Sequence, residues 1–161
     1  MPVTQDIVAT YRGPGRVVRR LLDMGPREDR ALAFVMIACA IVFIADTPRL
    51  AREAHVTGQE LNALLAGGLF AWVICMPLVL YLLAGLTHLI ARIFGGKGDW
   101  FGARLSLFWA LLATAPLILL NGLVAGFIGP GPTQTATGLL WFLVFLWFWM
   151  SGLIRAEGRA A

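Results

Sequence analysis

Charged residues are scarce in this chain. Only 14% of its 161 residues are Asp, Glu, Lys or Arg, whereas 59% are hydrophobic and the mean hydropathy is +0.79. A soluble domain carries about 25% charged residues, which it needs to cover its surface. The composition therefore excludes a soluble enzyme, an extended disordered chain and a collagen-like fibre, and it favours a protein that crosses a membrane several times.

Residue types that carry metal and nucleophile chemistry are also few. His55 and His88 are the only histidines, and no carboxylate lies at ligand spacing on their helix faces. We therefore predict no metal site and no cofactor. The only serines, Ser106 and Ser151, lack a glycine elbow and an orienting acid, which argues against a Ser/His hydrolase. We predict that the protein is not an enzyme.

The basic pI of about 9.8 does not indicate nucleic-acid binding. The 13 Lys and Arg residues mostly flank apolar runs, whereas phosphate binding needs a continuous cationic face. The sequence Gly95-Gly96-Lys97-Gly98 is not a Walker A loop, because Ala91 and Gly98 stand where that loop needs Gly and Ser or Thr. Neither a nucleic acid nor a nucleotide is expected as a partner.

Four apolar runs approach or exceed the roughly 20 residues that cross a hydrocarbon core of about 30 Å. They predict an all-α, polytopic transmembrane helical bundle at residues 31–154, with spans at about 31–47, 61–93, 104–128 and 136–154. Asp46 and Pro48 predict the end of the first span. The second is longer than one straight crossing needs, so we expect a bend at Pro77, and Pro116 lies near the middle of the third.

The N-terminal segment, residues 1–30, is amphipathic. At 100° per residue its Ile, Val, Leu and Tyr residues fall on one side, and the arginines fall on the other: Arg12, Arg16, Arg19 and Arg20. This pattern is typical of an interfacial helix on anionic lipid. A cap packed under the bundle is a compatible alternative. Gly13-Pro14-Gly15 predicts a break into two short helices, with Pro14 in the first turn of the second.

Basic residues divide unevenly between the two sides of the predicted bundle. Eleven flank one side, in residues 1–30, the second loop and the tail 155–161, and the other side has only Arg49 and Arg52. By the positive-inside rule, both termini and the loop 95–101 are cytoplasmic.

A few residues inside the spans are candidates for a polar site, for helix packing or for contact with lipid. His88 and Thr114 form a possible intramembrane polar site, although a His88 ring bonded to a neighbouring helix or a lipid head group explains that histidine as well. Asn121, Gly122 and Gly126 predict close helix packing, within the bundle or against a partner. Trp141, Trp147 and Trp149 are expected to face lipid near the interfaces.

The middle of the chain resembles a known family. After His88 come the loop 94–101 (FGGKGDWF), the run 107–110 (LFWA) and Pro116. This order is similar to the bacterial branch of the Ypt/Rab-interacting (Yip) domain family, in which a Gly-Gly-x-Gly-aromatic loop precedes a helix with an aromatic-small pair and a proline. The amphipathic opening with Ile7-Val8 and Pro14 is similar to that family too.

The resemblance implies a scaffold-like membrane protein of a bacterial inner membrane and supplies no catalytic residues. Many members have five spans, so either the segment 61–93 contains a re-entrant turn or a span is missing. We predict a non-enzymatic accessory subunit or scaffold that binds membrane lipid and another integral membrane protein. The alternative is a small transporter or lipid-moving protein, with a path lined by His88, Thr114 and Asn121.

Overall fold

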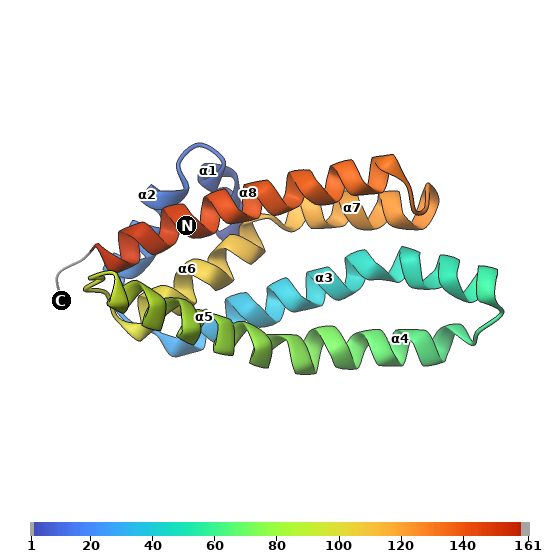
Figure 1. The fold of residues 1–161 in the computed structure, drawn as a ribbon, viewed down its shortest axis with the longest axis horizontal. Coiled ribbons are helices and arrows are strands. Elements are labelled where there is room, and N and C mark those ends of the chain that lie inside the picture. Colours follow the sequence, from blue (N-terminus) through green and yellow to red (C-terminus); the bar gives the residue numbers. More distant parts are fainter. Residues whose placement is uncertain (1, 159–161) are drawn as a thin grey trace.

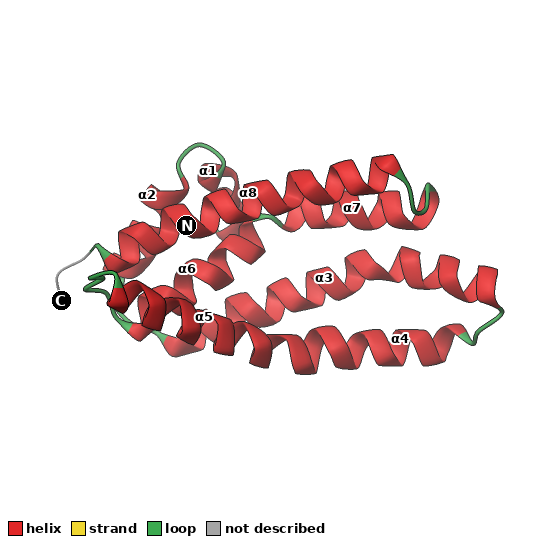
Figure 2. Ribbon diagram, viewed as in Figure 1, coloured by secondary structure: helices red, strands yellow, loops and turns green. Residues whose placement is uncertain are grey.

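A computed structural model describes residues 2–158, and this part of the chain is helical with no strand. Arg159, which belongs to the predicted cytoplasmic tail, lies outside the described residues. The elements are α1 (Val3–Thr10), α2 (Pro14–Asp23), α3 (Glu28–Thr57), α4 (Leu61–Leu69), the π-helix η1 (Phe70–Cys75), α5 (Met76–Ile93), α6 (Trp100–Ala113), α7 (Ala115–Phe127) and α8 (Pro132–Glu157). The predicted all-α class is confirmed (Figures 1 and 2).

Within residues 2–158, three helical segments are long and apolar enough to span a membrane: α3, the continuous run Leu61–Ile93, and α8. A fourth span is formed if α6 and α7, which meet at an angle of 49°, count as one broken crossing. The hairpins α3–α4 and α7–α8 lie at one end of the molecule, and the α5–α6 loop and the C-terminal end of α8 lie at the other (Figure 1). The chain is a multi-pass membrane protein.

Helix α3 does not end at Pro48 but continues to Thr57. A proline inside a helix has no N–H to donate to the carbonyl four residues earlier, here that of Ile44. The hydroxyl of Thr47 donates to the Ile44 carbonyl oxygen at 2.7 Å instead. The neighbouring threonine thus replaces the lost hydrogen bond, and the helix extends past the predicted end.

The segment Leu61–Ile93 contains no re-entrant turn, because it is helical throughout. Pro77 lies at the start of α5, and the backbone before it adopts a π-helix at Phe70–Cys75. Proline has no backbone N–H, so it cannot donate the usual hydrogen bond within the helix. A π-helical turn is one way in which a helix accommodates such an interruption. Among the described helices, a bend of 49° lies between α6 and α7.

Thr114 forms that bend, two residues before Pro116. Pro116 lacks the N–H that would bond the Leu112 carbonyl, so the α6 ladder cannot continue. The Thr114 hydroxyl lies within hydrogen-bonding distance of the carbonyl oxygens of Ala110 and Leu111, at 3.1 and 2.9 Å. Helix α6 therefore ends at Ala113. It is almost fully buried at the centre of the bundle.

Candidate functional site

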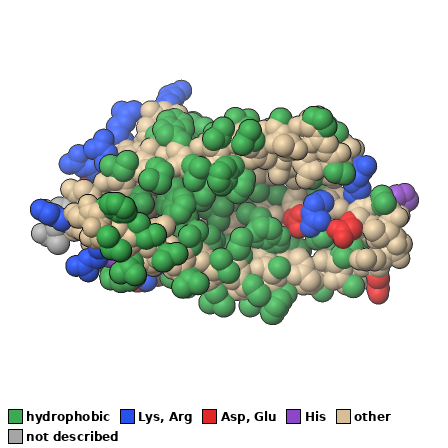
Figure 3. All heavy atoms as spheres, in the orientation of Figure 1, with side chains coloured by type: hydrophobic (Ala, Val, Ile, Leu, Met, Phe, Trp, Pro, Cys, Tyr) green, Lys and Arg blue, Asp and Glu red, His purple; other side chains and the backbone are tan. Residues whose placement is uncertain are grey.

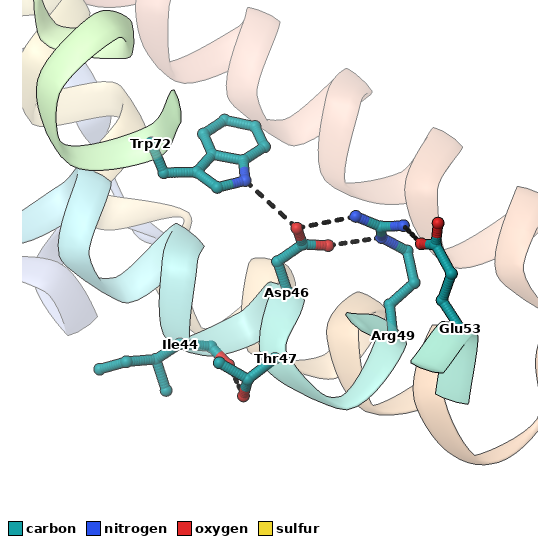
Figure 4. Close-up of polar contacts among 6 residues, drawn as sticks. All are labelled: Ile44, Asp46, Thr47, Arg49, Glu53 and Trp72. Carbon is teal, nitrogen blue, oxygen red and sulfur yellow. Dashed lines mark hydrogen bonds and ion pairs between the residues drawn. The ribbon is translucent and has the colours of Figure 1, made fainter. Parts of the chain in front are cut away.

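A charged cluster interrupts the apolar surface near the two hairpins (Figure 3). The Asp46 carboxylate accepts two hydrogen bonds from Arg49, from Nε at 2.6 Å and from Nη2 at 2.9 Å. The Nη1 group of Arg49 donates to Glu53 at 2.8 Å, and the Trp72 indole N–H donates to Asp46 at 3.3 Å (Figure 4). Two carboxylates and one guanidinium thus form a single network.

The order of residues on α3 builds this network. Asp46, Arg49 and Glu53 are three and four residues apart, which places them on one face of the helix. Trp72 comes from η1, on the neighbouring helical segment. The bidentate Arg49–Asp46 geometry fixes both planar groups, so the cluster is an ordered surface of both charge signs.

A cavity of about 440 Å³ opens beside this cluster. Asp46, Arg49 and Trp72 line its polar end, together with Asn121 of α7 and Gln134 of α8. The remaining wall is apolar and comes from several helices, with Cys39, Met76, Leu80, Leu83, Ile118 and Phe145 among its residues. The cavity is within the size range of small-molecule sites, and it is amphipathic along its length.

The predicted packing residues lie where α7 meets α3. A Cβ atom added to Gly122 would come within 1.9 Å of the Ala45 carbonyl oxygen, and one added to Gly126 within 2.2 Å of the Pro48 Cβ. The Asn121 side-chain oxygen accepts a hydrogen bond from Thr137 of α8 at 2.9 Å. This glycine pair therefore contacts α3 of the same chain.

His88 lies away from that cavity and is almost fully buried. Its Nδ1 atom is 2.7 Å from the carboxylate of Glu157, at the end of α8, and its ring packs against Trp100 with centroids 4.5 Å apart. The second Glu157 oxygen accepts the Gly98 backbone N–H at 3.2 Å, and its carbonyl accepts that of Lys97 at 2.9 Å. Of the alternatives for His88, the structure shows the ring bonded to a neighbouring helix.

Helices α1 and α2 form a cap on the bundle, separated at Gly13 with Pro14 opening the second, as predicted. Thr10 is buried and accepts the indole N–H of Trp109 in α6 at 3.1 Å. The Tyr11 ring meets Phe148 of α8 edge-on, with centroids 5.0 Å apart, and burial raises the pKa of the Tyr11 hydroxyl. Helix α2 therefore packs its apolar side into the bundle, through Val17, Val18 and Leu21, whereas Val8 of α1 is exposed.

The arginines of the cap lie on its outer side. Arg12, Arg16 and Arg19 are exposed, whereas Arg20 forms an ion pair with the buried Asp6 of α1. Arg12, Arg16 and Arg20 line a groove of about 520 Å³ between α1 and α2. Asp6 offsets the charge of Arg20, so Arg12 and Arg16 give this groove an excess of positive charge.

Comparison with known proteins agrees with this arrangement of helices. Residues 8–161 match the model of the Yip1 domain. The chain belongs to the Yip1 domain family. No curated protein and no solved structure matches it.

The residues that carry the Yip1 resemblance have structural roles here. Asp99 caps α6, because its side chain accepts the Gly102 backbone N–H at 2.8 Å. Gly98 lies so close to Ala156 that a Cβ atom would come within 2.5 Å of that residue's carbonyl oxygen. The loop of this Yip1 domain is therefore a docking point for the end of α8.

The remaining predicted site residues are dispersed. The Thr114 hydroxyl accepts the Trp141 indole N–H at 3.2 Å, so Trp141 is turned inward, and Trp149 is likewise half-buried. Trp147 is 51% exposed. The structure does not bring His88, Thr114 and Asn121 together at the cavity beside Asp46, because Asn121 lines it and the other two do not.

Sequence reasoning did not find the partners Trp72, Gln134 and Glu157. Each lies far along the chain from the residues that it contacts or with which it lines the cavity. Trp72, for example, is 26 positions from Asp46. The one available signal was the pair Asp46 and Glu53 flanking Arg49 at helical spacing, which predicts a local charge network.

Proposed function

We propose that this protein is a non-enzymatic scaffold or accessory subunit of a bacterial inner membrane. Its cap would bind anionic lipid on the cytoplasmic side, and its apolar surface would bind another integral membrane protein. The groove between α1 and α2 carries the proposal, because three arginines line it while Val18 and Leu21 on the other side of α2 are buried. Each basic side chain near an anionic surface contributes about 1 kcal/mol of binding.

Contacts with the bundle hold α1 and α2, and the arginines that they carry, in a fixed orientation. Thr10, Tyr11 and the valines of α2 are anchored in the bundle, so the guanidinium groups are presented by a rigid support. Arg30 adds to this anchor by donating to the carbonyl oxygens of Leu21 and Gly25, at 2.9 and 3.1 Å. A preorganised basic surface loses less side-chain entropy when it binds a phosphate.

We expect the double variant Arg12→Gln and Arg16→Gln to retain fewer anionic lipids than the wild type. The measurement is native mass spectrometry of protein released from nanodiscs that contain equal amounts of phosphatidylglycerol and phosphatidylcholine. Loss of two basic contacts should lower the retention of phosphatidylglycerol about tenfold or more. Arg20 stays unchanged in this variant, because it pairs with Asp6.

The matched control is Arg92→Gln with Lys97→Gln, which removes the same charge from the same end of the molecule but outside the groove. The control should retain phosphatidylglycerol almost as the wild type does. Equal losses in both variants, or no loss in either, would refute a specific lipid site in the groove.

A further inference from the structure

The lateral cavity beside Asp46 is separate from the cap, and its chemistry points to a different ligand. We propose that it binds one phospholipid with a zwitterionic head group that bears a primary ammonium, of the phosphatidylethanolamine class. The head group would lie at Asp46 and Arg49, with an acyl chain along the apolar wall. This site goes beyond the proposed function, since it takes another lipid at another place.

The position of the cavity along α3 supports a lipid from a single leaflet. Arg49 lines one end and Cys39 another part of the wall, ten residues earlier, which corresponds to about 15 Å along a helix. A hydrocarbon core is about 30 Å thick, so this length matches one leaflet. Asp46 is 18 residues after the start of α3 at Glu28, about 27 Å along the helix, which places it near the far interface.

The charges at the polar end complement a head group with both signs. Asp46 lines the cavity and supplies carboxylate oxygens for an ammonium, and Glu53, which pairs with Arg49 outside the cavity lining, adds a second negative charge. Arg49 uses three of its five N–H groups in the network with Asp46 and Glu53, through Nε, Nη1 and Nη2, which leaves two for a phosphate. Neighbouring Arg52 is directed to the Gly126 carbonyl oxygen and does not line the cavity.

Further hydrogen-bonding groups at the same end have no partner within the part of the chain that the structure describes. They are the amide N–H group of Asn121, whose oxygen is taken by Thr137, and the side-chain amide of Gln134. Both residues line the cavity and are half-buried. These amide groups can donate hydrogen bonds to the ester and phosphate oxygens of a glycerolipid.

A primary ammonium fits this end better than a choline. The carboxylates accept N–H donors, which choline lacks, and recognition of a quaternary ammonium uses a cage of aromatic faces. The indole N–H of Trp72 is directed at Asp46, so that ring helps to hold the carboxylate in place (Figure 4). Two carboxylates share one guanidinium, so the cluster has an excess negative charge that an ammonium complements and a purely anionic head group does not.

The test uses the full chain in nanodiscs with equal amounts of phosphatidylethanolamine, phosphatidylcholine and phosphatidylglycerol. The wild type should retain phosphatidylethanolamine about tenfold over phosphatidylcholine after release, measured by native mass spectrometry, because charge-assisted hydrogen bonds are lost with choline. Asp46→Asn should reduce this preference toward equality. Glu60→Gln, an exposed residue at the same end outside the cavity, should keep it.

A second variant fills the apolar part of the cavity and leaves Asp46 and Arg49 unchanged. Leu83→Trp should lower the amount of phosphatidylethanolamine retained, while phosphatidylglycerol at the cap is unaffected. Equal retention of the ethanolamine and choline lipids by the wild type would overturn the proposal, as would an unchanged preference in folded Asp46→Asn. A second copy of the chain that protects the cavity, shown by a dimer without bound ethanolamine lipid, would overturn it too.

Discussion

Gly122→Ala is expected to destabilise the protein strongly. The new Cβ atom would lie 1.9 Å from the Ala45 carbonyl oxygen and 2.7 Å from its carbonyl carbon. Both atoms belong to the backbone of α3, so no side chain can move aside and α7 must separate from α3. Overpacking of this kind costs typically 1–3 kcal/mol, and a backbone clash lies at the upper end, so we expect a loss of about 3 kcal/mol in the free energy of unfolding.

The measurement is unfolding in detergent micelles followed by tryptophan fluorescence. Gly126→Ala should behave similarly, because its Cβ would lie 2.2 Å from the Pro48 Cβ. Gly67→Ala is the matched control: this glycine is also inside a helix, but its added Cβ meets nothing within 4 Å. The control should be neutral or slightly stabilised, because Ala favours helix over Gly by about 1 kcal/mol.

The outcome also separates two roles of the glycine pair. A face that serves only self-association would tolerate Gly122→Ala in the monomer and lose an oligomer instead. Unchanged stability of the variant, with the oligomeric state altered, would contradict the close α3–α7 contact.

His88→Leu should produce the second large effect. It removes the partner of the Glu157 carboxylate, which is 2.7 Å away and buried beside the α5–α6 loop. Removing one member of a buried pair is strongly destabilising, by about 3 kcal/mol, because the other polar group stays buried. Thermal unfolding measures the effect, and limited trypsin digestion at Lys97 should accelerate as the loop loses its anchor on α8.

Two further variants test whether the pair itself is responsible. The double variant His88→Leu with Glu157→Leu should be more stable than His88→Leu alone, since it leaves no buried carboxylate without its partner. His55→Leu, at an exposed position in the last turn of α3, should change stability by no more than about 0.5 kcal/mol. A His88→Leu protein as stable as His55→Leu would show that the contact contributes little.

Local signals in the sequence predicted the helical elements well. Apolar runs predicted the membrane segments, and Gly13-Pro14-Gly15 predicted the division of the cap, because proline and glycine act on their own neighbourhood. The signal at Pro48 did not predict that the helix itself continues to Thr57. There the effect of the proline depends on the adjacent Thr47 hydroxyl, which a rule about proline alone does not include.

The candidate sites were harder to predict because they depend on contacts between distant residues. Glu157 is 69 positions from His88, and its burial follows from how α8 meets the α5–α6 loop. Apolar periodicity indicates which face of a helix is covered, but not which helix covers it. The lateral cavity is a property of four or more helices together, so no single segment predicts it.

The central claim is that this member of the Yip1 domain family works as part of a larger membrane assembly. The most direct test is native mass spectrometry of the chain purified from its own membranes in a mild detergent. We expect a complex of fixed stoichiometry with another integral membrane protein. A bare monomer under the same conditions would contradict the claim, and flux of a substrate by the chain alone in liposomes would favour the transporter alternative.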